Sequence, residues 1–134
     1  DVDISNVERS KIANKAGADI FVRVHANGSE SSSVNGVECY NMSKKNPYNA
    51  HLYSKSRKLS EKICNAFAKK TGAKNRGAFD VDNMTGINWC EVPVTIVEMG
   101  YMSNPSEDEK MAKDSYRRLM AEGMAEGIDD YFGF

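Results

Sequence analysis

Residues 19–25 read Asp-Ile-Phe-Val-Arg-Val-His, a mostly apolar, β-branched run that an Ala26-Asn27-Gly28 turn follows. Such a run is typical of a strand covered on both faces in a parallel or mixed sheet. Because side chains alternate along a strand, Arg23 and His25 are predicted to share one face. A second run, Pro93-Val94-Thr95-Ile96-Val97-Glu98, has the same character and also ends in a polar side chain.

Segments with helical spacing alternate with these strands. We expect helices over 6–16, 52–70 and 105–132, a short strand over 37–40, and irregular structure over 74–88. Ser5 or Asn6 would cap the first helix, Gly72 would end the second, and Asn104-Pro105-Ser106-Glu107 predicts a capping box for the third. This alternation predicts an α/β fold with a mixed, mainly parallel sheet and helices on both faces.

Composition narrows the function classes. The chain has 134 residues, a net charge of -1 and 40% apolar residues, which fits one domain. A near-neutral charge argues against nucleic acid as a partner, and no stretch approaches the roughly 18 apolar residues of a membrane span. The three cysteines lie too far apart in sequence for a local zinc knuckle. We interpret Cys39, Cys64 and Cys90 as reduced core or surface thiols.

Charge is unevenly distributed. Ten basic residues and one acid lie between Lys44 and Arg76, whereas eight acids and four bases follow from Glu107 onward. The simplest interpretation is two solvated helix faces of opposite sign. The alternative is a weak attraction of the basic segment for an anionic wall surface.

The two predicted strands end in His25 and Glu98, and each is followed by a short segment that contains glycine. In open α/β sheets the site lies beyond the carboxyl ends of the strands. Imidazole is a good zinc ligand at neutral pH, and a carboxylate beside it can accept a proton from water. This pair fits a metal hydrolase, but a single histidine at a strand end is more often only hydrogen-bonded, so spacing alone favours the second interpretation.

Four blocks in one order carry a family resemblance. They are Arg9-Ser10-Lys11-Ile12-Ala13-Asn14, Ala18 through Gly28 around His25-Ala26-Asn27, Gly36-Val37-Glu38-Cys39-Tyr40, and Val97-Glu98-Met99-Gly100-Tyr101-Met102-Ser103-Asn104. With Asn75-Arg76-Gly77, they resemble the zinc-dependent N-acetylmuramoyl-L-alanine amidases of the Amidase_3 type. The resemblance covers essentially the whole chain and implies a fold similar to the phosphorylase/hydrolase-like zinc amidases.

The resemblance implies a function and a site. A peptidoglycan hydrolase would cleave the amide between N-acetylmuramic acid and L-alanine with zinc-activated water, outside a bacterial cell, as a secreted cell-wall autolysin. His25 corresponds to the second histidine ligand of Zn²⁺, and Glu98 corresponds to the catalytic base. Peptidoglycan would be the partner, with an additional wall-binding module or an activator as further candidates.

The departures from the family pattern are specific. The family's Gly-His-Gly-Gly loop and first-helix glutamate have no counterpart here, so both remaining zinc ligands are expected upstream of Asp1. We therefore expect residues 1–134 to be a single catalytic domain that lacks its N-terminal strand-helix-strand portion. Alone, this chain is expected to bind zinc weakly and to lack normal turnover. His51, the other histidine, is a surface residue in this interpretation, with a substitute zinc ligand as the alternative.

Other residues near the predicted site have two interpretations each. Arg23 stands where the family is expected to have a small residue, so it makes a buried ion pair or contacts an acidic group of the stem peptide. Asn27 either caps the turn after its strand or orients a ligand. Trp89 and Tyr101 pack in the core or face a glycan.

Two rival functions remain at this point. A catalytically inactive wall-binding or regulatory domain of the same fold would explain the missing ligands. A different zinc hydrolase on a related fold, such as a carboxypeptidase, would make the His-Ala-Asn block a coincidence. Retention of both His25 and Glu98 favours the enzyme.

Overall fold

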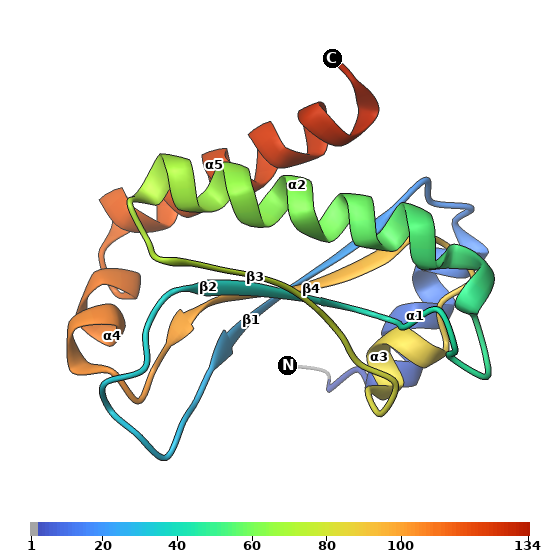
Figure 1. Cartoon of the computed structure of the whole chain (residues 1–134), viewed down its shortest axis with the longest axis horizontal. Coiled ribbons are helices and arrows are strands. Elements are labelled where there is room, and N and C mark those ends of the chain that lie inside the picture. The colour runs from blue at the N-terminus through green and yellow to red at the C-terminus, as the bar shows by residue number, and fades with distance from the viewer. Residues whose placement is uncertain (1–2) are drawn as a thin grey trace.

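A four-stranded mixed sheet organises the computed structural model, which describes residues 3–134 (Figure 1). The strands are β1 (Phe21–Asn27), β2 (Val37–Asn41), β3 (Asn75–Asp80) and β4 (Val94–Tyr101), and their order is β1-β4-β2-β3. The β1–β4 and β2–β3 pairs are parallel, and the β2–β4 pair is antiparallel. The predicted α/β fold with a mixed, mainly parallel sheet is confirmed.

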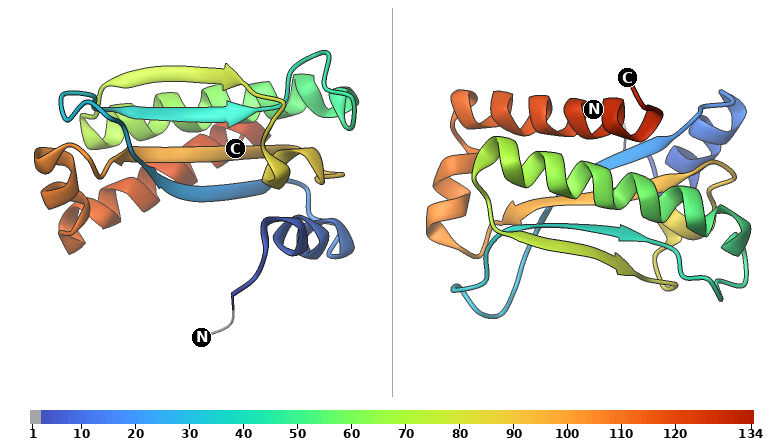
Figure 2. Two further views of the ribbon diagram at one scale, coloured as in Figure 1. Left: turned by 90° about the horizontal axis from the view of Figure 1, so that it is seen from below. Right: turned by 45° about the horizontal axis from the view of Figure 1, so that its top comes forward.

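Two long helices cover one face of the sheet. They are α2 (Tyr53–Thr71), which follows a 3₁₀ turn (Ala50–Leu52), and α5 (Asp114–Phe132). Seen from below, the sheet lies in front of both (Figure 2). Helices α1 (Asn6–Lys15) and α3 (Thr85–Asn88) pack against each other near the end of the sheet where β1 and β4 begin. This arrangement leaves much of the second face without a long helix.

Strand alternation divides the core into two clusters. On the face of α2 and α5, Val97 of β4 packs with Leu59, Ile63 and Phe67 of α2 and with Met120 of α5. On the other face, a second cluster consists of Met42, Leu52, Ile87, Cys90, Val94 and Ile96. Residues two apart on β4 share a face. Glu98 therefore follows Val94 and Ile96 onto the second face, opposite to α2.

Two parts of the expected secondary structure were wrong. Residues 74–88 are not irregular but contain β3 and α3, because the edge strand draws its stability from pairing with β2 rather than from an apolar run. The C-terminal helix is two helices, α4 (Pro105–Met111) and α5, separated at Ala112 and Lys113.

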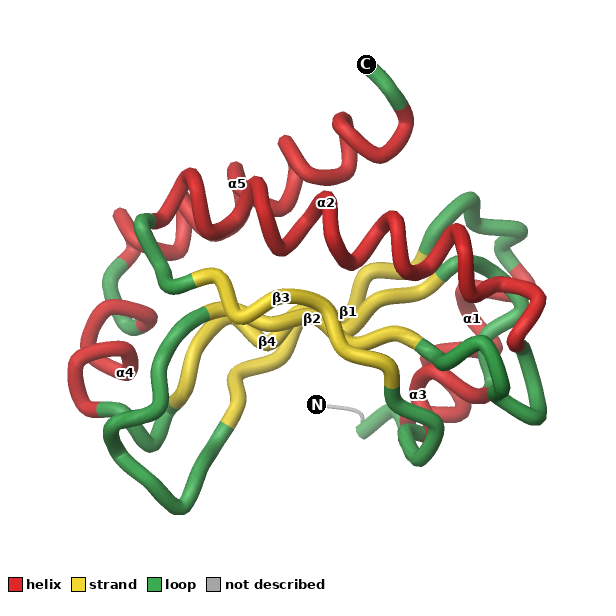
Figure 3. The backbone as a smooth tube through the Cα atoms, in the orientation of Figure 1, coloured by secondary structure: helices red, strands yellow, loops and turns green. Residues whose placement is uncertain are grey.

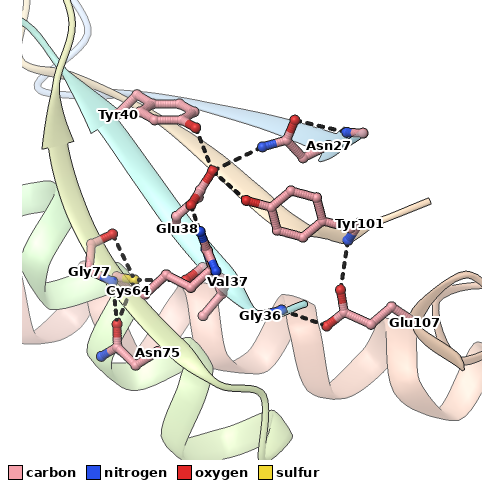
Figure 4. Close-up of polar contacts among 12 residues, drawn as sticks. Asn27, Gly36, Val37, Glu38, Tyr40, Cys64, Asn75, Gly77, Tyr101 and Glu107 are labelled. Carbon is pink, nitrogen blue, oxygen red and sulfur yellow. Dashed lines mark hydrogen bonds and ion pairs between the residues drawn. The ribbon is translucent and has the colours of Figure 1, made fainter. Parts of the chain in front are cut away.

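The N-terminus of α4 confirms the predicted cap but not the reciprocal contact. Asn104 accepts hydrogen bonds from the backbone N–H groups of Ser106 and Glu107. The Glu107 carboxylate instead accepts from the backbone N–H groups of Gly36, at 2.9 Å, and Tyr101, at 2.8 Å (Figure 4). It therefore joins the start of β2 to the end of β4, a contact that only the tertiary structure provides.

The three cysteines and the two charged segments have structural roles. Cys39, Cys64 and Cys90 are free thiols in the core. Lys70 of the basic helix α2 lies 3.2 Å from Glu122 and 2.7 Å from Glu126 of the acidic helix α5. The opposite charges thus face each other along the α2–α5 contact. Within residues 3–134, no helix combines the length and the apolar character needed to cross a bilayer.

Candidate active site

His25 and Glu98 meet in the C-terminal halves of β1 and β4, which continue to Asn27 and Tyr101 and do not end at this pair as the sequence predicted. The two residues are register partners in the parallel pair, so the fold aligns them directly. The His25 Nδ1 atom lies 2.8 Å from one Glu98 carboxylate oxygen and 3.0 Å from the other. The His25 side chain is 65% exposed and that of Glu98 is 6% exposed. The structure therefore brings the two predicted residues into one hydrogen-bonded pair with its imidazole facing outward.

A pocket of about 360 Å³ opens beside this pair. Its wall includes Arg23, His25, Ile96 and Glu98 from the two strands, and residues 83–86 also line it.

The loop that follows β1 lies at the same end of the molecule as α4 (Figure 3). Ser29 N–H donates to the Ser103 hydroxyl at 3.0 Å, which ties together the loops that follow β1 and β4.

Glu38, the second residue of β2, is a buried carboxylate that the sequence did not single out. It is the register partner of Glu98 in the antiparallel pair. One carboxylate oxygen accepts hydrogen bonds from the Tyr40 hydroxyl, from the Tyr101 hydroxyl at 2.8 Å and from Asn27 Nδ2 at 3.0 Å (Figure 4). The other accepts from Arg76 Nε at 2.7 Å. A charged residue within the apolar strand 37–40 was the signal that could have revealed it, because a buried charge needs partners.

These contacts determine the ionisation of the cluster. Burial alone would raise the pKa of Glu38, but hydrogen bonds from Tyr40, Arg76 and Tyr101 outweigh it, and the pKa lies below its usual value. Burial, together with the neighbouring Glu38 carboxylate, raises the pKa of Tyr101 to about 12. Glu38 is therefore an anion, and Tyr101 is a neutral hydrogen-bond donor to it.

The remaining predicted residues divide between the site and the scaffold. Asn27 donates to Glu38 and accepts from the Gly28 N–H at 2.8 Å, so it both joins the buried cluster and caps the turn after β1. Tyr101 is buried, whereas Trp89 is 54% exposed with the Lys11 ammonium 5.9 Å from its ring. His51 is exposed in the turn before α2 and is not part of the pocket wall.

The described side chains provide too few ligands for a catalytic zinc site. Catalytic zinc sites commonly have three protein ligands. In the part of the chain that the structure describes, no three His, Cys, Asp or Glu side chains come together as a group that could hold a metal. His25 and Glu98 provide one imidazole and one carboxylate, so the described residues do not by themselves fit zinc.

The fold and the site together define an α/β domain with a histidine–glutamate pair on adjacent parallel strands, near their carboxyl ends. The family model for N-acetylmuramoyl-L-alanine amidase (Amidase_3) matches residues 1–130. The chain therefore belongs to the N-acetylmuramoyl-L-alanine amidase family, as the sequence motifs predicted.

Individual relatives support this assignment. N-acetylmuramoyl-L-alanine amidase LytC of Bacillus subtilis is 32% identical over 130 residues, which are 93% of this chain and 24% of LytC. The catalytic domain of the amidase CwlV from Bacillus (Paenibacillus) polymyxa superposes with a TM-score of 0.85 at 30% identity, over 99% of this chain and 68% of that domain. The amidase AmiC2 of Nostoc punctiforme superposes with a TM-score of 0.83 at 29% identity, over 100% of this chain and 69% of the AmiC2 chain. The chain thus spans about a quarter of LytC and two thirds of these solved domains.

Proposed function

We propose that this chain is the catalytic part of a peptidoglycan amidase that hydrolyses the amide between N-acetylmuramic acid and L-alanine. The observation that carries the proposal is the His25–Glu98 pair beside the 360 Å³ pocket. Family membership supplies the reaction class. Names such as cell wall amidase LytH among the relatives support a cell-wall, extracellular location.

In this reaction Glu98 acts as the general base. Its carboxylate is buried on the protein side and borders the pocket, so a water molecule bound there would lie against it. Glu98 takes a proton from this water as the amide carbon is attacked, and the same carboxyl group returns the proton to the leaving amine of L-alanine. The His25 Nδ1 contact fixes the orientation of the carboxylate.

Zinc dependence is part of the proposal. A bound zinc ion would polarise the amide carbonyl and lower the pKa of water. His25 would provide one ligand through its exposed imidazole. The described residues alone do not complete a zinc site.

The second candidate is a catalytically inactive domain that binds the cell wall. The incomplete donor set in residues 3–134 is the observation that favours it. It differs from the enzyme in one measurable respect, because an inactive domain would bind peptidoglycan without releasing new amino groups of L-alanine.

The test is digestion of purified peptidoglycan, with newly exposed L-alanine amino groups counted by N-terminal labelling and mass spectrometry. The wild-type protein, assayed with added Zn²⁺ because its own residues hold zinc weakly, should release them. Glu98→Gln should lower the rate roughly 10²- to 10⁴-fold, because the isosteric amide cannot accept the proton. Glu91→Gln, at an exposed position, is the matched control and should keep the wild-type rate.

One outcome would decide against the enzyme, and another would decide against Glu98 as its catalytic base. Binding to peptidoglycan without release of amino groups by the wild-type protein would establish the inactive domain. Release that Glu98→Gln leaves unchanged would remove Glu98 from the mechanism.

A further inference from the structure

Arg23 lies inside the candidate active site. It precedes His25 by two positions on β1, where side chains return to the same face of the sheet, and both residues border the pocket. Its register partner on β4 is Ile96, an apolar residue, whereas that of His25 is Glu98. The sheet therefore gives His25 a carboxylate partner and gives Arg23 none.

The guanidinium of Arg23 has no carboxylate partner among the residues that the structure describes. Nη2 donates to the neutral Asn6 Oδ1 at 2.6 Å. Among residues 3–134, no carboxylate oxygen lies within 4.0 Å of a guanidinium nitrogen of Arg23, the distance limit for an ion pair. The buried ion pair that the sequence suggested is therefore not present among these residues. Burial lowers the pKa of Arg23, and nearby Arg9 adds to this effect while Cys90 and Glu98 oppose it. Arginine nevertheless remains protonated at neutral pH.

Gly86 leaves space that the guanidinium occupies. A Cβ atom at this position would lie 1.7 Å from Arg23 Nη1 and 2.6 Å from its Cζ, so a side chain here would displace the arginine head group. The head group thus lies between the α3 backbone and the Asn6 side chain. A guanidinium has five N–H donors, and the contact with Asn6 uses Nη2. The other donors have no hydrogen-bond partner among residues 3–134, and Arg23 borders the pocket.

We propose that Arg23 binds a free carboxylate of the stem peptide, on the residue that follows L-alanine. This inference rests on the proposed amidase function and specifies its substrate. Two positions along a strand span roughly 6.6 Å, which separates Arg23 from His25 along β1. An extended peptide residue spans roughly 3.3–3.6 Å, so the α-carboxylate of the second residue lies about 7 Å from the scissile nitrogen. The reach of the peptide is thus of the same order as the spacing of the two residues along the strand.

A carboxylate is the group that this site selects. Arginine presents paired donors in a plane that suits the two oxygens of a carboxylate, and the charge adds to each hydrogen bond. A carboxamide at the same place offers one oxygen and no charge. It also directs its own N–H groups at a cation. The enzyme should therefore discriminate between stem peptides with a free and an amidated second residue.

The experiment compares two synthetic ligands, N-acetylmuramoyl-L-alanyl-D-glutamate and its D-isoglutamine counterpart, in which the α-carboxylate is an amide. Cleavage is measured as kcat/KM, and binding is measured by calorimetry with the Glu98→Gln protein. Wild type should prefer the carboxylate roughly 10- to 100-fold, the range of a hydrogen bond to a charged group. Arg23→Gln should reduce this ratio to about one, and Arg118→Gln, an exposed arginine of α5, should keep it.

The outcomes separate the two proposals. Cleavage of both ligands with equal kcat/KM by wild type would overturn the role of Arg23 and leave the amidase function intact. Absence of both binding and cleavage would overturn both. If Arg23→Gln does not fold, Arg23→Lys keeps the charge without the planar fork and should retain a reduced preference for the carboxylate. A full preference in a folded Arg23→Gln protein would also contradict the proposal.

Discussion

Glu38 and Glu98 place two buried carboxylates at paired positions on adjacent strands. Like charges directly opposite each other destabilise a sheet. Each carboxylate has its own partner here, because Arg76 contacts Glu38 and His25 contacts Glu98. The more deeply connected of the two is Glu38, which links Asn27 at the end of β1 to Tyr101 at the end of β4. We infer that Glu38 supports the strand ends on which the active-site pair lies.

Replacement of Glu38 by glutamine should therefore lower stability. The amide keeps the shape of the side chain but loses the charge that Arg76 and the two tyrosine hydroxyls contact. We expect the free energy of unfolding at pH 7 to fall by about 2–3 kcal/mol, the range for hydrogen bonds to charged groups. Urea unfolding measures this difference, and Glu91→Gln is the exposed control.

The same variant gives a pH prediction. The pKa of folded Glu38 lies below its unfolded value of about 4.5, so the stabilisation is fully present above that pH and is lost as the pH falls through the folded pKa. The difference in the free energy of unfolding between wild type and Glu38→Gln should thus be about the same at roughly pH 6 and 7. It should shrink below about pH 4.5. A difference that grows on acidification would contradict the depressed pKa.

Among the helices, α5 contacts α2 through two glycines one turn apart. A Cβ at Gly123 would lie 2.8 Å from the Phe67 Cα, and one at Gly127 would lie 2.5 Å from the Ile63 Cα. Both obstacles are backbone atoms, which cannot move aside as a flexible side chain can. The close approach places Met120 of α5 in the core cluster with Ile63 and Phe67.

Gly127→Ala should therefore separate the two helices. Overpacking costs about 1–3 kcal/mol, and the better helix propensity of alanine returns up to about 1 kcal/mol. We expect a net loss of about 1–2 kcal/mol in the free energy of unfolding, measured by thermal or urea unfolding. Ala125→Val enlarges an exposed position of the same helix and should change it by less than about 0.7 kcal/mol. A stabilised Gly127→Ala protein would show that the contact is not tight.

For the molecule as a whole, metal content tests how much of a zinc site residues 1–134 contain. One imidazole beside one carboxylate holds zinc weakly compared with the three ligands of a catalytic site. A chain of verified mass 14.9 kDa should retain well below one zinc per molecule after dialysis. His25→Ala should remove what remains, and His51→Ala should not. One tightly held zinc per chain would show that these residues complete a site.

Some helices and strands were predicted from the sequence and others were not. Strand β1, helix α2 and the Asn104 cap of α4 were predicted, because each depends on local patterns of apolar residues or on a capping side chain. Strand β3 was missed because its residues 75–80 form a strand through pairing with β2. The break between α4 and α5 was missed because both segments have helical composition.

At the candidate site too, local sequence features were predictable and contacts between distant segments were not. His25 and Glu98 were identified from their positions at strand ends and from the family motifs, and the parallel register brings them together. The sequence could not show which partner Arg23 has, since Asn6 and Gly86 reach it from other elements. It also could not connect Glu38 with Arg76, which lies 38 positions away.

The sequence by itself thus determined the α/β class, the family and the choice of His25 and Glu98 as candidate site residues, because periodicity, strand positions and motif order are properties of neighbouring residues. Only the tertiary structure decided the sheet order, the buried Glu38 cluster and the contact of Arg23 with Asn6. These depend on which side chains distant segments bring within hydrogen-bond distance, and that is set by packing across the whole molecule.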